Sequence, residues 1–213
     1  MFTGLIEAVC IVKTVRRTGR TMLLSVDLGN LADDCKISDS IAVNGVCLTI
    51  TKLSGSVADF DVSAETITKS TLEVLKPSSE VNIERAVKAD GRFGGHFVLG
   101  HIDGTAVVKA VDKQAQFAEI KFAAESELLD SMVLKGSVAV DGISLTVAGI
   151  DKDVFSVAII PETLNKTTLA KVKINDKVNI ETDIIVKTIK KQLDKILPQT
   201  QPLTAEKLKG LGF

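Results

Sequence analysis

The chain has 213 residues, of which 45% are hydrophobic, and a formal net charge of −1. Its basic residues are scattered, which gives no electrostatic basis for binding nucleic acid, and no apolar run reaches the ~18 residues of a membrane helix. Three cysteines are too few for a disulfide framework, and the leading MFTGLIEAV lacks the features of a signal peptide. We therefore expect a soluble protein of the cytoplasm.

The first half of the chain is predicted to consist of short strands. Runs rich in β-branched and aromatic residues alternate with turn signals such as the PSSE of residues 77–80. The predicted strands span residues 7–15, 21–28, 41–51, 57–62 and 81–87. Because no long helical pattern separates these runs, they favour an antiparallel barrel or sandwich over an α/β fold.

A short helix is predicted to begin after Ser63, which can cap it, with Glu65 placed favourably in the first turn. Pro161 stands at the matching position of the second half, and proline is best tolerated in the first turn of a helix. The second half repeats the pattern of strands, and it contains one further predicted helix over residues 125–133. Its predicted strands span residues 105–111, 117–122, 138–147, 154–159 and 177–184.

Both histidines lie in a glycine-rich connection between the halves, residues 90–104. Its five glycines indicate close backbone approach, and no Gly-Lys-Ser/Thr follows them, so a phosphate-binding loop is not expected. His96 and His101 would lie on opposite faces of a strand, and no third ligand is suggested nearby, so no metal site is expected. Either histidine can equally be structural.

An amphipathic helix is predicted over residues 185–197. Apolar residues recur there at steps of three and four, with lysines on the opposite face: Val186, Ile189, Leu193 and Ile196. Two interpretations remain open, because the helix can pack on its own domain or join copies of the chain through its apolar side. Residues 199–213 are expected to form a loosely held tail.

An internal repeat organises the whole chain. The segment SIAVNGVCLTI at residues 40–50 returns as SVAVDGISLTV at residues 137–147, with six identical positions at an offset of 97. The same offset relates residues 64–72 to 161–169 and 81–86 to 178–183, and an offset of 96 relates 4–13 to 100–109. The repeat predicts two homologous domains, 1–96 and 97–184, followed by a C-terminal segment, 185–213.

Four differences between the copies cluster near the repeated motifs. The paired residues are Cys47 and Ser144, Asn44 and Asp141, Ala86 and Asp183, and Leu5 and His101. The second copy carries the more polar or ionisable group in three pairs, including an imidazole that can move protons near neutral pH. The pattern favours a more reactive second copy, although each of these residues is about as well explained by a structural role, such as a buried apolar Cys47.

Five motifs in fixed order, covering residues 1 to about 190, closely resemble the riboflavin synthase family of duplicated lumazine-binding barrels: MFTGLIE, SIAVNGVCLTI, GGHFVLGHIDG, KGSVAVDGISLTV and IPETLNKTTL. The resemblance implies an all-β fold of two six-stranded antiparallel Greek-key barrels with short helices, and a C-terminal α-helix that joins three chains. It also implies a transferase that moves a four-carbon unit between two molecules of 6,7-dimethyl-8-ribityllumazine. The products would be riboflavin and 5-amino-6-ribitylamino-2,4-pyrimidinedione, with no cofactor or metal.

In this family the active site lies between the first barrel of one subunit and the second barrel of its neighbour, and association with lumazine synthase is possible. The resemblance implies two groups of binding residues. One comprises Gly4, Leu5, Ile6, Cys47, Leu48, Thr49, Asp61, Val62, Ser63, Ala64, Glu65 and Thr66. The other comprises Gly100, His101, Ile102, Lys135, Ser144, Leu145, Thr146, Ile160, Pro161, Glu162, Thr163, Leu164 and Asn165.

The catalytic group expected from the resemblance is His101, Ser144, Thr146 and Asp183, with Ser40 and Cys47 assisting from the first barrel. The residue that removes the methyl proton and the group that adds at C7 of the lumazine are left open. The main alternative is a non-catalytic lumazine or flavin carrier of the antenna type. Such carriers lose the second-barrel motifs, whereas GHIDG and DGISLTV are intact here. A flavin-reductase-type barrel would need a nucleotide-binding domain downstream, and only about thirty residues follow the second copy.

Overall fold

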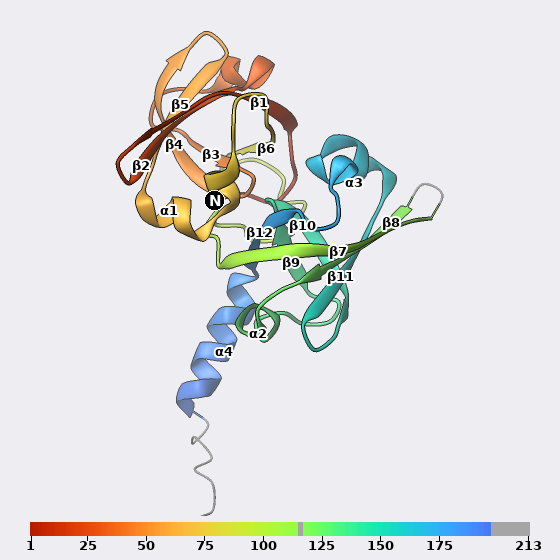
Figure 1. Ribbon diagram of the computed structural model, residues 1–213. Helices are drawn as coiled ribbons and strands as arrows, with labels where there is room; N and C mark the ends of the chain where they lie inside the picture. Colours follow the sequence, from red (N-terminus) through yellow and green to blue (C-terminus); the bar gives the residue numbers. More distant parts are fainter. Residues whose placement is uncertain (115–116, 197–213) are drawn as a thin grey trace, which may run out of the picture.

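The computed structural model describes residues 1–114 and 117–196, which form two closed six-stranded barrels with a helix projecting from them (Figure 1). All strand pairs within the barrels are antiparallel. The expected all-β fold is therefore confirmed. The tail expected at 199–213 lies outside the described residues.

The two barrels share one strand order. Around the first barrel the neighbours run β1-β2-β5-β4-β3-β6, and around the second β7-β8-β11-β10-β9-β12. The first barrel consists of β1 (Ala8–Thr18), β2 (Thr21–Asp27), β3 (Ser40–Val43), β4 (Val46–Ser54), β5 (Val57–Val62) and β6 (Glu80–Arg85), with η1 (Gly29–Asp34), α1 (Ala64–Lys69) and η2 (Thr71–Val74) between strands. The second consists of β7 (Gly104–Gln114), β8 (Phe117–Ala123), β9 (Ser137–Val140), β10 (Ile143–Ile150), β11 (Val154–Ile159) and β12 (Lys177–Thr182), with α2 (Ser126–Leu129), α3 (Pro161–Lys166) and η3 (Thr168–Lys171).

Each barrel has its own apolar core, because alternate side chains of every strand point inward. Leu24 and Phe60 are fully buried in the first core. In the second core the rings of Phe122 and Phe155 stack with centroids 5.1 Å apart. The residues between the inward-facing ones are left on the outer faces of the barrels, where ligands can reach them.

Two segments expected to be single strands, 41–51 and 138–147, are hairpins instead, and this prediction was wrong. Each is divided by a two-residue turn, between β3 and β4 and between β9 and β10. All four turn residues have positive φ: Asn44, Gly45, Asp141 and Gly142. Asn-Gly and Asp-Gly tolerate that conformation and form the tight turns that match strand twist, so the signal was present in the sequence.

The helix ends follow the predicted capping. The Ser63 hydroxyl accepts a hydrogen bond from the backbone N–H of Thr66 at 3.2 Å, and Pro161 occupies the first turn of α3. The helix expected over 125–133 is shorter than predicted, since α2 covers only Ser126–Leu129.

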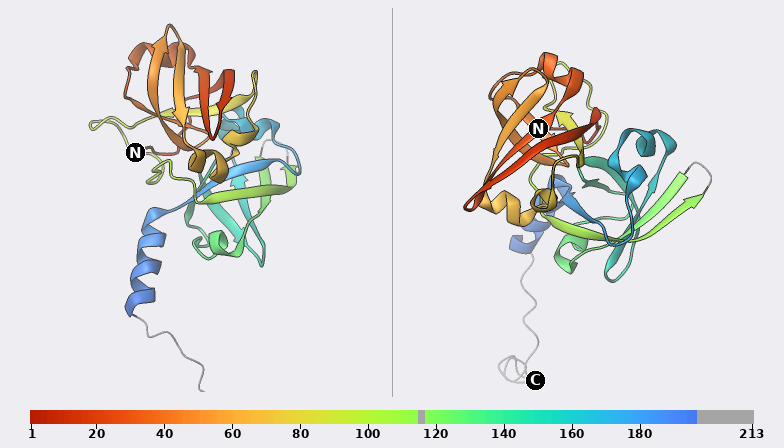
Figure 2. Two further views of the ribbon diagram at one scale, coloured as in Figure 1. Left: turned by 60° about the vertical axis from the view of Figure 1, so that its left-hand side comes forward. Right: turned by 45° about the horizontal axis from the view of Figure 1, so that its top comes forward.

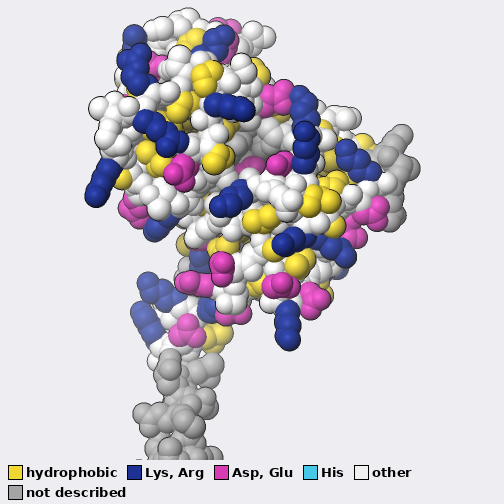
Figure 3. All heavy atoms as spheres, viewed as in Figure 1, with side chains coloured by type: hydrophobic (Ala, Val, Ile, Leu, Met, Phe, Trp, Pro, Cys, Tyr) yellow, Lys and Arg dark blue, Asp and Glu magenta, His cyan; other side chains and the backbone are white. Residues whose placement is uncertain are grey.

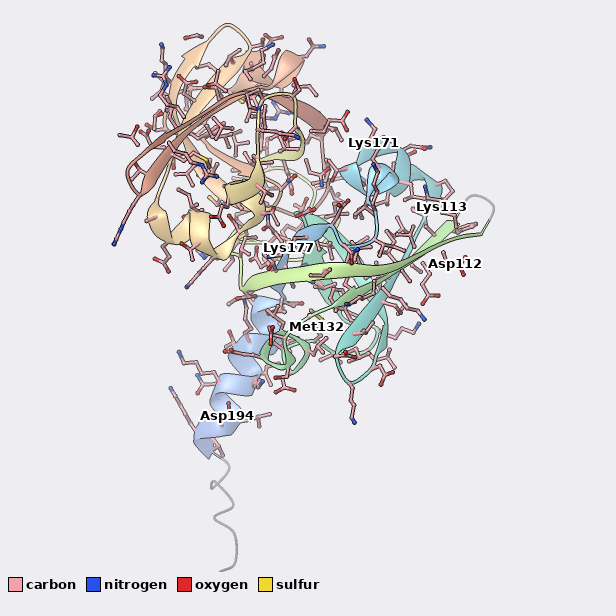
Figure 4. All side chains as sticks on the ribbon, in the orientation of Figure 1. Asp112, Lys113, Met132, Lys171, Lys177 and Asp194 are labelled. Atoms are coloured by element: carbon pink, nitrogen blue, oxygen red, sulfur yellow. The ribbon has the colours of Figure 1, made fainter. Side chains whose placement is uncertain are left out.

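The last described element, α4 (Ile184–Ile196), extends away from both barrels (Figure 2). Its first turns are attached by Lys187, whose ammonium group lies 2.8 Å from the Asp103 carboxylate. Asp194 marks the distant end (Figure 4). Ile184 and Val186 are half-buried, and four further apolar side chains are roughly half or more exposed: Ile185, Ile189, Leu193 and Ile196. None of the helices within the described ranges combines the length and apolarity that crossing a membrane demands.

The barrels meet through a polar interface that is nearly two-fold symmetric. The side-chain amide of Asn82 donates to the carbonyl of Asp141 at 3.1 Å, and that of Asn179 donates to the carbonyl of Asn44 at 2.8 Å. At its edge, Lys171 in η3 forms an ion pair with Glu80 on the first barrel, 2.6 Å apart (Figure 4). The paired amides fix the relative position of the barrels, because buried polar groups retain partners only in one arrangement.

Candidate functional site

The leading segments of the two copies are exchanged between the barrels. The carbonyl of Gly4, at the start of the first copy, accepts a hydrogen bond from the backbone N–H of Ser144 on β10 at 2.8 Å. The carbonyl of Gly100, at the start of the second copy, accepts one from the N–H of Cys47 on β4 at 3.0 Å. Each barrel is thus completed by a segment that belongs to the other repeat.

Neighbouring residues show the same exchange. Ile6 packs against the core of the second barrel, and Ile102 packs against the core of the first. Between the barrels the two segments pair with each other, since the N–H of Phe2 donates to the carbonyl of Val98 at 2.7 Å and the reverse bond measures 3.2 Å. The segment before β1 and the segment before β7 cross at the Phe2–Val98 pair.

The exchange corrects the grouping expected from the sequence. That grouping placed Gly4–Ile6 with Cys47 and Gly100–Ile102 with Ser144, whereas the structure brings Gly4 to Ser144 and Gly100 to Cys47. The physical reason is that a repeat shows which segments are equivalent but not which barrel each one packs against. Exchange of identical elements between equivalent units leaves the repeat pattern unchanged.

Glycine is required at both crossing points. Gly4 and Gly100 have φ of 78° and 81°, in the region that side chains disfavour. A Cβ on Gly4 would lie 2.6 Å from the Cβ of Ser144, and one on Gly100 would lie 2.4 Å from the Cβ of Cys47. The backbone of each segment therefore lies directly against the residue at which the copies differ.

Ser144 and Thr146 share the outer face of β10. Leu145 and Val147 alternate with them and point into the second core. The matching residues of the first barrel, Cys47 and Thr49, lie on the outer face of β4, and Ser40 is directly opposite Thr49 on β3. Each barrel therefore presents a row of small polar side chains on the outer face of its hairpin.

Sequence reasoning missed the partner of Ser144. The Nδ1 atom of His96 lies 2.7 Å from the Ser144 hydroxyl, and His96 is only 8% exposed. Burial lowers the pKa of His96 below its ordinary value, and the negative charge of Asp183 opposes that shift. A neutral His96 accepts a hydrogen bond from the serine hydroxyl when its proton is on Nε2 and donates one when its proton is on Nδ1, and Nε2 has no hydrogen-bond partner among the described residues.

Among the described residues, no imidazole is hydrogen-bonded to the thiol of Cys47, whereas the hydroxyl of Ser144 has that of His96. The two outer-face rows share a geometry but differ in their capacity to move a proton.

Two further residues were not singled out from the sequence, namely Glu84 and Glu181. They occupy equivalent positions on β6 and β12, and both carboxylates accept hydrogen bonds from the exchanged segments. Burial raises the pKa of both carboxyls above the ordinary value, and the backbone donors partly offset this. The shared VNIE motif was visible in the repeat, but a strand pattern alone does not indicate a buried acid.

The remaining expected binding residues lie next to the crossing glycines and at the starts of two helices. His101 and Leu5 are exposed next to the crossing glycines, and Leu5 lines, with Ser40 and Glu84 of the first copy, a cleft of about 800 Å³. The starts of α1 and α3 are equivalent and carry the exposed or half-buried members: Asp61, Ser63, Ala64, Glu65, Thr66, Ile160, Pro161, Glu162, Thr163, Leu164 and Asn165. Asp183 begins α4, where its carboxylate accepts from the N–H of Ile185 at 2.9 Å.

Some expected residues point elsewhere. The side chains of Leu48, Val62 and Leu145 are buried in the barrel cores, so only their backbone atoms remain available to a ligand. Lys135 is exposed at the turn before β9, where its N–H donates to the carbonyl of Val147 at 2.9 Å. Ser40 also borders a cleft of about 800 Å³.

Charge does not mark a site on the face shown in Figure 3, since basic and acidic side chains are interspersed there. The two rows are marked instead by small side chains, backbone carbonyls and crossing glycines. Such a lining of hydrogen-bonding groups beside apolar surface suits a flat, neutral heterocycle.

Comparisons with known proteins show which family the chain belongs to. A model of the Lumazine binding domain matches twice, over residues 3–86 and 99–183. The chain is 40% identical over 195 residues to riboflavin synthase of Bacillus subtilis (strain 168), covering 92% of this chain and 91% of that one. It is 40% identical over 216 residues to riboflavin synthase of Actinobacillus pleuropneumoniae, covering 100% of each.

Among solved structures, LumP complexed with 6,7-dimethyl-8-(1'-D-ribityl) lumazine superposes with a TM-score of 0.78 at 21% identity, covering 85% of this chain and 99% of that one. LumP complexed with riboflavin gives a TM-score of 0.79 at 23% identity, with the same coverage. These likenesses show the fold of two barrels. From the family model and the full-length relatives together, the chain belongs to the riboflavin synthase family of enzymes.

Proposed function

We propose that this protein transfers a four-carbon unit between two molecules of 6,7-dimethyl-8-ribityllumazine and releases riboflavin and 5-amino-6-ribitylamino-2,4-pyrimidinedione. The observation that carries the proposal is a pair of equivalent sites with unequal chemistry: Ser144 is paired with the buried His96 in one, and no buried imidazole is paired with Cys47 in the other. Two like substrates with unlike roles require such a pair. The carbons transferred are C6 and C7 of the donor and their two methyl groups, and the reaction is redox-neutral.

The second-barrel site comprises the outer face of β10, the Gly4–Ile6 segment and the start of α3. We assign proton handling there to His96, Ser144 and Asp183. A neutral His96 accepts the proton of the Ser144 hydroxyl, and the carboxylate of Asp183 favours the imidazolium that forms. The serine oxygen is then available to orient or add to the electron-poor ring of the lumazine.

The first-barrel site comprises the outer faces of β3 and β4, the Gly100–Ile102 segment and the start of α1. Cys47, Thr49 and Ser40 offer hydrogen-bonding groups there, and His101 adjoins them through the exchanged segment. Because it lacks a buried histidine, we assign this site to holding the second lumazine in position. Correct orientation of two reactants can itself supply a large share of the rate enhancement.

Assembly is part of the proposal. The apolar side of α4 is exposed, and each such side chain would contribute about 1.5–3 kcal/mol if fully buried against another copy. We propose that three chains associate through α4, so that the first barrel of one faces the second barrel of its neighbour. We also propose residues 1–96 and 97–184 as the two lumazine-binding units, a cytoplasmic location and association with lumazine synthase.

The test is turnover by the purified protein supplied only with 6,7-dimethyl-8-ribityllumazine. Riboflavin fluorescence should appear at about half the molar amount of lumazine consumed. Tight binding of the lumazine without riboflavin formation would contradict the proposal and indicate a carrier. A Ser144→Ala variant should bind lumazine with turnover reduced by about 100-fold, within the range for loss of an acid–base group.

A further inference from the structure

The buried carboxylates of Glu84 and Glu181 hold the exchanged segments by the same geometry. Glu84 is 4% exposed, and its two oxygens accept from the N–H of Thr3 at 2.7 Å and of Gly4 at 2.9 Å. Glu181 is 2% exposed, and its oxygens accept from Leu99 at 2.8 Å and Gly100 at 2.9 Å. Each carboxylate thus accepts hydrogen bonds from two successive backbone amides.

The N–H and the carbonyl of each crossing glycine bond to different barrels. Gly4 donates its N–H to Glu84 on the first barrel, while its carbonyl accepts from Ser144 on the second. Gly100 donates to Glu181 on the second barrel, while its carbonyl accepts from Cys47 on the first. A single residue therefore links a buried acid of one barrel to the outer-face row of the other.

Only a carboxylate satisfies this arrangement. Two N–H donors converge on the two oxygens of each carboxylate, and the Thr3 hydroxyl also donates to Glu84 at 2.7 Å. Hydrogen bonds to an ionised acceptor are stronger than neutral ones. Glutamine has the same shape but presents an NH₂ group to one of the donors, so one amide loses its acceptor. Leaving a buried donor without a partner costs more than an average hydrogen bond contributes.

We propose that Glu84 and Glu181 are positioning residues that act crosswise: Glu84 on the first barrel sets the geometry of the Ser144 site, and Glu181 on the second sets that of the Cys47 site. The consequence for turnover rests on the proposed function, whereas the crossed geometry does not. A residue that merely stabilised its own barrel would affect the site on that same barrel.

Thiol alkylation tests whether each glutamate acts on the site of the other barrel. The rate at which N-ethylmaleimide modifies Cys47 is followed by peptide mass spectrometry in the full chain and in the Glu181→Gln and Glu84→Gln variants. Because Gly100 lies against Cys47, Glu181→Gln should raise the rate by about tenfold, the scale of one buried charge-assisted bond, and Glu84→Gln should leave it within about twofold.

The reciprocal measurement uses Ser144→Cys as a reporter. Here Glu84→Gln should raise the alkylation rate at position 144, and Glu181→Gln should not. Effects confined to the barrel that carries the substitution, or equal at both thiols, would overturn the proposal. Should a variant fail to fold, hydrogen exchange in the unmodified protein decides instead: the amides of Gly4 and Gly100, outside any strand, must exchange slowly, and rapid exchange would overturn the proposal.

Lumazine titration separates this proposal from the proposed function. If the crossed alkylation pattern appears but no lumazine binds, the positioning role stands and the proposed function fails. If lumazine binds and turns over but the alkylation effects are not crossed, the positioning role fails alone. With both correct, Glu84→Gln and Glu181→Gln each lower turnover, and the alkylation pattern identifies which site is disturbed.

Discussion

Asp141 offers the sharpest test of the electrostatics between the barrels. It is 8% exposed in the β9–β10 turn, and its carboxylate accepts from the N–H of Asn179 at 2.7 Å. The first copy has Asn44 at this position, with the equivalent bond from Asn82 at the same distance. Asp141→Asn therefore places in the second copy a side chain that the same environment already accommodates in the first.

The magnitude follows from linkage. Burial raises the pKa of Asp141 from 3.8 to about 7. Between these values the folded state holds a proton that the unfolded state has lost, so the contribution of Asp141 to the free energy of unfolding falls as pH rises from about 4 to about 7 and is level outside that window. At about 1.4 kcal/mol per pKa unit, ionised Asp141 costs on the order of 4 kcal/mol at pH 8 relative to pH 4.

The assay is urea unfolding of the wild type and Asp141→Asn from pH 4 to pH 8.5. The variant should be more stable at pH 8 by several kcal/mol, and its advantage should shrink toward zero at pH 4. Asn44→Asp is the matched control: it should lose stability at pH 8 and recover it at low pH. A difference between wild type and Asp141→Asn that does not change with pH would refute the argument from burial.

Three other substitutions test the sites and the assembly. Protonation of His96 should lower turnover at acid pH, and because the pKa of His96 is lowered, this fall should lie below about pH 6.5. In a pH–rate profile, the His96→Gln variant should not show this fall. In thermal unfolding, Gly100→Ala should lower the stability more than Gly19→Ala. Both glycines have positive φ, but only a Cβ on Gly100 would lie against a side chain, 2.4 Å from the Cβ of Cys47. Equal losses of stability would mean that backbone strain alone causes them. Truncation before Ile185 should leave folded monomers with little turnover, and an active monomer in size-exclusion chromatography would exclude a shared site.

The barrels could be predicted from the sequence because strand alternation and the repeat are local signals. The repeat gave two independent sequences for each element: Ser63 and Pro161, for example, each predict the start of the same helix in its own copy. The division of residues 41–51 and 138–147 into hairpins also has a local signal, the dipeptides Asn-Gly and Asp-Gly. The turn was not predicted because apolar residues on both sides of it read as one continuous strand.

The exchange of segments could not be predicted in this way. Gly4 and Ser144 are far apart in the chain, and nothing near Gly4 distinguishes docking on the second barrel from docking on the first. The roles of His96 and Glu84 depend on the same long-range placement. Residue type suggested chemistry for Ser144, but its partner became apparent only once the crossing was known.

The crossing also orders events during synthesis. Ser144, against which the Gly4 segment docks, is synthesised 140 residues after Gly4. At about 5–20 residues per second, the segment waits roughly 7–28 s before its acceptor surface exists. The first barrel, including β1, can therefore assemble while the segment around Gly4 still lacks its partner on the second barrel, so this segment is among the last to reach its native position.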